Sequence, residues 1–220
     1  FFGVFGNYGV AIVALTVLVR FLLYPLNATS FKQMKAMQDI QPEVKRLREQ
    51  YTDKQQQQTE LMALYKKRGV NPVGGCFPIL IQMPIFIGLY SALLLAIELR
   101  HAPFAFWISD LSSKEHLTIF GVGFPVMVIL MVASMLVQQW LTPTIGDPTQ
   151  KKVMMVMPFV FGFMFAGMPA GLTLYWLTSN VLAIAQQKMM QSKDSKYALH
   201  VTVATSIGLL IIAMTTAQLG

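Results

Sequence analysis

The sequence is poor in charge and in cysteine. Of its 220 residues, 12% are charged, about half of the roughly 25% that is typical of soluble domains. Cys76 is the single cysteine, so no internal disulfide can form. Hydrophobic residues make up 55% of the chain, and its mean hydropathy is +0.54. A soluble domain of this size cannot hide so much apolar surface. The composition excludes a disordered chain, a disulfide scaffold and an ordinary soluble enzyme, and it predicts a polytopic helical membrane protein.

Motifs for covalent chemistry are absent as well. The sequence has no phosphate-binding loop, metal-ligand spacing, nucleophile elbow or catalytic dyad. Residues 71–75 (NPVGG) resemble a glycine-rich loop but lack the Lys-Ser/Thr pair, so we interpret them as a turn. We therefore expect no enzyme activity, cofactor, nucleotide or metal. The net charge of +7 fits the Lys/Arg bias of cytoplasmic loops, and we expect no sequence-specific nucleic-acid binding.

Six apolar runs, without strand alternation, predict membrane helices at residues 8–26, 77–97, 119–141, 153–168, 172–187 and 198–219. The fourth and fifth runs span only about 24 Å at 1.5 Å per residue, which predicts local bilayer thinning or flanking water. Nine Lys and Arg residues lie between residues 32 and 68, and five more follow the third and fifth runs. The opposite side holds Arg100 and Lys114. This bias predicts that the first helix starts outside the cytoplasm.

The long polar segment between the first two runs predicts a cytoplasmic helical hairpin. Its apolar residues recur every three or four positions, Pro42 favours a helix restart, and Gly69 favours a helix end. We interpret it as a docking arm for a partner or a lipid surface; the alternative is a solvated hairpin that only aids topology. The expected division is residues 1–30 for the first core helix, 31–71 for the hairpin, 72–191 for four further core helices and 192–220 for an additional membrane segment.

Arg20 is the most unusual residue of the apolar runs. It lies about 18 Å along the first run from Tyr8 and about 9 Å before Leu26. A central arginine costs about 2.5–3.5 kcal/mol on insertion scales. We interpret Arg20 as facing a water-filled cavity, the alternative being that it snorkels to cytoplasmic headgroups. No acid lies within the first five helix cores. Glu98, at the outer end of the second run, is a candidate partner, but an ion pair with Arg20 requires both side chains to reach far and the helices to tilt.

Other polar or amphipathic residues within the runs are candidates to line the same cavity, although each is equally explained as a contact between helices. They are Thr16, Gln82, Gln138, Gln139, Thr173, Trp176 and Asn180. The last three are spaced i, i+3, i+7 on one helix face. A proton relay needs an intramembrane acid or histidine chain, which the runs lack. Methionines recur at Met127, Met131 and Met135, as lipid-facing filler or as an adaptable surface for apolar segments.

Several stretches resemble the YidC/Oxa/Alb membrane insertase family, and the bacterial YidC branch in particular. They are VRFLLYPL at residues 19–26, NPVGGCFPILIQMPIF at 71–86, ELRHAPF at 98–104, WISDL at 107–111 and GLTLYW at 171–176. The resemblance covers about residues 1–190. It implies five core helices, a cytoplasmic hairpin, and a groove that is open to cytoplasm and lipid but closed outside. By the family's pattern Arg20 is the groove arginine, and Gln139 and Trp176 line the groove.

The resemblance also implies a function. It is that of an insertase and chaperone of the bacterial inner membrane, with nascent membrane proteins and the lipid bilayer as partners, and the Sec translocon and the ribosome as further ones. We expect an upstream signal or anchor before Phe1. The rival interpretations are a small-anion channel with Arg20 as its selectivity charge, and a scaffold that assembles other membrane subunits. After Met190 the sequence departs from the family's basic tail, and the last run is a sixth helix, a fused substrate-like segment or an engineered addition.

Overall fold

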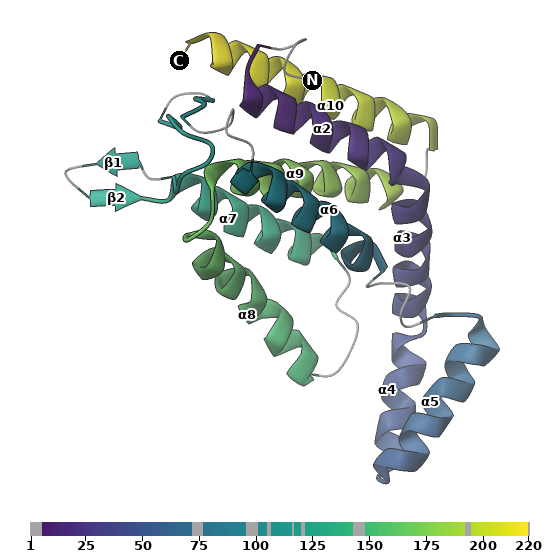
Figure 1. Ribbon diagram of the computed structural model, residues 1–220. Coiled ribbons are helices and arrows are strands. Elements are labelled where there is room, and N and C mark those ends of the chain that lie inside the picture. Colours follow the sequence, from purple (N-terminus) through teal and green to yellow (C-terminus); the bar gives the residue numbers. More distant parts are fainter. Residues whose placement is uncertain are drawn as a thin grey trace.

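The computed structural model describes residues 6–71, 77–95, 101–104, 107–115, 117–119, 122–142, 148–191 and 195–219. These residues are mainly helical, with one small two-stranded sheet (Figure 1). The elements are α2 (Tyr8–Leu22), α3 (Tyr24–Asp39), α4 (Gln41–Gln50), α5 (Lys54–Arg68), α6 (Phe77–Leu95), β1 (Leu117–Ile119), β2 (Val122–Phe124), α7 (Val126–Leu141), α8 (Pro148–Phe165), α9 (Ala170–Gln191) and α10 (Ser195–Leu219).

The first predicted helix is divided in two. The apolar run was expected to continue to Leu26, but α2 ends at Leu22 and α3 begins at Tyr24 after a bend of 61°. Pro25 explains the break, because it lacks the N–H for a bond to the preceding turn yet suits the first turn of a new helix. Among the described residues no single helix is both long and apolar enough to cross a membrane, whereas α2 and α3 together meet that criterion.

The third predicted helix begins later than expected. Residues 119–124 were expected to be helical, but α7 starts at Val126, and β1 and β2 pair antiparallel just before it. The predicted absence of strands is wrong here. Pro125 disfavours a helical conformation for Phe124, and the β-branched residues of this stretch suit strands.

The fourth and fifth helices are longer than their apolar runs. α8 has 18 residues and α9 has 22, against the 16 residues expected for each. Polar ends such as Lys151 and Lys188 continue the helices beyond the apolar stretch, whereas α8 ends at Phe165, before the expected end at Met168. The apolar part of α8 is nevertheless short, at Lys152–Phe165, so the thinned bilayer stays a prediction. The last run does form a helix, α10.

Helix α9 lies at the centre of the bundle. It packs against α2, α7 and α10, and α6 and α8 complete the arrangement (Figure 1). Leu172 and Tyr175 of α9 are buried in one cluster with Met127 and Met131 of α7, so these two methionines are core residues and not lipid-facing filler. By contrast α8 presents a mostly apolar exposed surface, which includes Met155, Phe159 and Phe163.

The hairpin has a small core of its own. Met37, Ile40, Val44 and Val70 are buried together, and Leu61, Leu64 and Tyr65 pack against them. As predicted, the chain restarts a helix at Pro42, and Gly69 ends α5 in the left-handed conformation with φ of 64°. Because this core is separate from that of the bundle, α4 and α5 project away from the other helices (Figure 1).

Candidate functional site

Arg20 lies on α2, where this helix packs against α9, and its side chain is half-buried. Its Nε donates a hydrogen bond to Ser179 Oγ of α9 at 3.2 Å. Within the part of the chain that the structure describes, no carboxylate pairs with Arg20. Glu98, the candidate partner, falls outside the described residues. The guanidinium has five N–H donors, so most of its hydrogen-bonding capacity remains for other groups.

Gln82 joins this region from α6. Its Nε2 donates to the hydroxyl of Tyr175, which is itself buried in α9. Tyr175 and Ser179 are one helical turn apart on α9, so their side chains lie on the same helix face. The structure thus brings Arg20, Ser179, Tyr175 and Gln82 into one polar chain across α2, α9 and α6. The sequence analysis singled out Arg20 and Gln82 but missed Tyr175 and Ser179.

Trp176 lies in an aromatic cluster next to this polar chain. Its ring centroid is 5.4 Å from that of Phe86 on α6, 5.6 Å from Phe161 and 5.2 Å from Phe165, the latter two on α8. The contacts with Phe86 and Phe165 are edge-to-face, a favourable geometry for aromatic rings. These contacts link α6 to α8 and α9, two consecutive helices that lie far from α6 in the sequence. Trp176 remains half-buried, so part of the ring is accessible.

The remaining candidates of the predicted cavity occupy varied environments. Thr16 is fully buried and donates to the carbonyl of Ile12 in its own helix. Thr173 is also buried, and the amide of Asn180 donates to Ser134 Oγ of α7 at 3.0 Å. Gln138 and Gln139 are half-buried near the end of α7. A separate open cavity of about 420 Å³ lies far from these residues, at the hairpin tip, and is lined by Tyr51, Asp53, Gln55, Gln56, Thr59 and Glu60.

The loop between α6 and α7 ties together the ends of three helices. Asn7 caps α2 through Oδ1 and donates from Nδ2 to the carbonyl of Phe104 at 3.1 Å. Glu115 accepts from the indole of Trp107 and from the backbone N–H of Met127, in the first turn of α7. The carbonyls of Leu111 and Ser113 accept from the first N–H groups of α9. Sequence reasoning missed this set, although an asparagine just before an apolar run is a recognisable capping signal.

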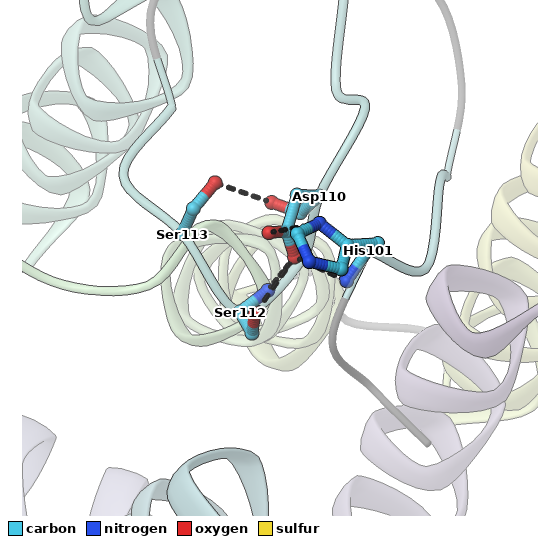
Figure 2. A network of polar contacts seen from close by, with 4 residues as sticks. All are labelled: His101, Asp110, Ser112 and Ser113. Carbon is cyan, nitrogen blue, oxygen red and sulfur yellow. Dashed lines mark hydrogen bonds and ion pairs between the residues drawn. The ribbon is translucent and has the colours of Figure 1, made fainter. Parts of the chain in front are cut away.

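Asp110 is the centre of the polar network in this loop (Figure 2). Its Oδ1 accepts from Ser112 N at 2.8 Å, from Ser112 Oγ at 2.7 Å and from His101 N at 3.1 Å. Nδ1 of the exposed His101 ring lies 3.6 Å from Oδ2. Burial acts to raise the pKa of Asp110, but the bonds from Ser112 and His101 outweigh it and hold the pKa below its usual value.

The lowered pKa predicts an acid-sensitive loop. A carboxyl whose pKa is lower in the folded state adds stability above the pKa of the unfolded chain, about 3.9 for aspartate, and this stability is lost as the pH falls through the folded value. We expect Asp110→Asn to lower the thermal stability of the purified protein at neutral pH and to flatten its pH dependence below about pH 5. Ser112→Ala, which keeps the carboxylate, should give a smaller change in the same direction. An unchanged pH profile for Asp110→Asn would contradict the assignment.

Comparison with known proteins places this arrangement in a family. The family model described as 60Kd inner membrane protein matches residues 1–197. A membrane protein insertase YidC of Syntrophus aciditrophicus is 52% identical over 182 residues, which are 82% of this chain and 32% of that protein. Its counterpart in Aeromonas hydrophila is 51% identical over 202 residues, which are 91% of this chain and 36% of that protein. The chain therefore spans about a third of the length of these relatives.

A solved structure agrees with the sequence comparison. The crystal structure of an active YidC insertase with its first transmembrane domain resolved matches with a TM-score of 0.67 and 31% identity, over 84% of this chain and 42% of that one. The helical insertase fold implied by the sequence resemblance is thereby confirmed. The chain belongs to the 60Kd inner membrane protein family of the bacterial inner membrane, the family of the YidC insertases.

Proposed function

We propose that this chain is the core of a membrane protein insertase and chaperone, which moves short hydrophilic segments across the membrane and releases apolar helices into lipid. The observation that carries the proposal is Arg20, a cation inside the helix bundle whose one described hydrogen bond to the protein is made by Nε. A guanidinium in this position needs water or other acceptors for its remaining N–H groups. We infer a hydrated groove beside Arg20 that is open to the cytoplasm and closed outside.

In this mechanism the groove shortens the dry path for a polar segment of a nascent membrane protein, since moving such a segment through hydrocarbon is costly. Arg20 attracts the acidic groups of the segment, and a pair at 4 Å is worth about 4 kcal/mol at an effective dielectric near 20, before desolvation losses. The apolar helix then leaves along α6 and α8, whose outer faces expose Met83, Ile87, Phe159 and Phe163. Burial of its surface in lipid drives this last step.

The loop between α6 and α7 supports the closed outer side, because it joins the ends of α2, α7 and α9. The basic hairpin supports a cytoplasmic docking arm, for which the ribosome and the Sec translocon are the proposed partners. No step of the mechanism uses a nucleotide or covalent chemistry. A small-anion channel, the main rival, needs a pore open to both sides, and a passive assembly scaffold does not need Arg20.

Cysteine accessibility tests the proposed groove. In a Cys76→Ser background, Arg20→Cys, Gln139→Cys and Trp176→Cys should react with a membrane-impermeant thiol reagent from the cytoplasmic side and resist it from outside. Lys66→Cys on α5 is the cytoplasmic control, Lys114→Cys is the outside control, and Leu172→Cys is a buried control, since the first two residues are exposed and Leu172 is fully buried. Labelling from both sides would support a channel, and labelling from neither would indicate a dry, packed core.

A further inference from the structure

The polar chain beside Arg20 has a consistent direction of donation. Arg20 Nε donates to Ser179 Oγ, so the hydroxyl hydrogen of Ser179 remains available for an acceptor, and the hydroxyl of Tyr175 belongs to the residue one turn earlier on the same helix face. Gln82 donates to the same Tyr175 hydroxyl from α6. Both side chains are buried, with Tyr175 1% exposed and Ser179 4% exposed. The acceptor that Arg20 uses is therefore a buried side chain of α9, next to a tyrosine that is itself bonded to α6.

An acceptor fixed at Nε determines how the guanidinium lies. The group is planar, and its donors form a rigid fork. With Nε bound to Ser179, the two terminal nitrogens Nη1 and Nη2 are the pair left for another ligand, and within the described residues neither has a protein partner. Such a pair matches the two oxygens of a carboxylate in a bidentate geometry. A lysine in the same place has neither the Nε anchor nor the fork.

We propose that Ser179, next to the bonded pair of Tyr175 and Gln82, is a positioning residue for Arg20, and that it aims the terminal nitrogens of Arg20 at carboxylates of the translocating segment. This inference rests on the proposed function and adds a specificity to it. Ser179 fixes the orientation of the guanidinium, so the two terminal nitrogens point in a defined direction. The groove therefore favours a carboxylate, which accepts both hydrogen bonds, over a neutral polar group.

The experiment is a mutant cycle in reconstituted vesicles. It compares a single-span substrate whose outer segment carries Asp and Glu with the same substrate carrying Asn and Gln. Ser179→Ala should lower insertion of the acidic substrate about three- to tenfold, the range expected for the loss of one ordinary hydrogen bond. It should leave the neutral substrate unchanged, and Ser179→Thr, which keeps the hydroxyl, should restore the acidic substrate. In an Arg20→Lys background, Ser179→Ala should have no further effect, because lysine has no Nε to anchor.

Tyr175→Phe provides an independent variant that keeps the buried ring and should lower insertion of the acidic substrate in the same direction by a smaller factor. Equal losses for both substrates, or an undiminished effect of Ser179→Ala in the Arg20→Lys background, would overturn the positioning role and leave a structural one. Arg20→Ala distinguishes failure of the positioning inference from failure of the proposed function. If it lowers insertion of the acidic substrate while Ser179→Ala does not, the positioning inference alone fails. If Arg20→Ala has no effect, the proposed function fails.

Discussion

Replacing Arg20 by alanine is expected to reduce insertion of a substrate with an acidic outer segment by at least about tenfold. Even a third of the roughly 4 kcal/mol available to a pair at 4 Å corresponds to a factor of ten in rate. Arg20→Lys should retain more activity than Arg20→Ala, because it keeps the charge, but less than the parent, because it loses the directed donors. The measurement is the initial rate of substrate protection from external protease in vesicles that contain the purified protein.

The matched control is Lys114→Ala, which also removes one positive charge, but from an exposed position in the loop between α6 and α7. It should leave the rate close to that of the parent, since exposed charges are screened by salt and solvent. A neutral-segment substrate serves as the second control for Arg20→Ala and should be inserted at nearly the parental rate. Equal rates for Arg20→Ala and the parent on the acidic substrate would exclude a role for the charge.

The sequence predicted the helices better than their ends. Each of the six apolar runs contains a helix, because an uninterrupted apolar stretch has few ways to satisfy its backbone in lipid other than helix formation. The ends depended on local chemistry that competes with hydrophobicity. Pro25 divided the first run at Leu23, and Pro125 delayed α7 and left the preceding residues to pair as strands. Polar residues beyond the apolar runs continued α8 and α9, because a helix does not stop where its hydrophobic part does.

The candidate site was only partly predictable for a different reason. Arg20 was conspicuous because its charge is costly among apolar neighbours. Gln82 was conspicuous because it is a polar residue within an apolar run. Ser179 gave no such signal, since a serine is tolerated in any membrane helix. Whether it faces Arg20 depends on the rotation of α9, which is set by the packing of Leu172 and Tyr175 in the core. The predicted face was instead that of Thr173, Trp176 and Asn180. Of these, Trp176 contacts α6 and α8, and Asn180 contacts α7.

Removal of the hairpin is expected to abolish most delivery of substrate while leaving the bundle folded. The deletion should take residues 41–68 and replace them by a short Gly/Ser linker, because α3 contacts α6 and α9 and belongs with the bundle. The hairpin core is separate from that of the bundle, so the thermal midpoint in detergent should change by less than about 5 °C. At limiting substrate, insertion should fall at least about tenfold, because a tethered docking arm acts by raising the effective concentration of substrate.

A point variant in the hairpin core tests whether the folded hairpin is needed, because it disrupts the hairpin without removing its residues. Val44 is 3% exposed in the hairpin core, and Val44→Asp places a charge there without shortening the protein. It should reproduce the delivery defect and the stable bundle, whereas Gln58→Ala, at an exposed position of α5, should do neither. If the deletion prevents stable folding in detergent, the hairpin is a structural part of the bundle. If both hairpin variants deliver substrate at the parental rate, the docking role is excluded and the hairpin serves topology alone.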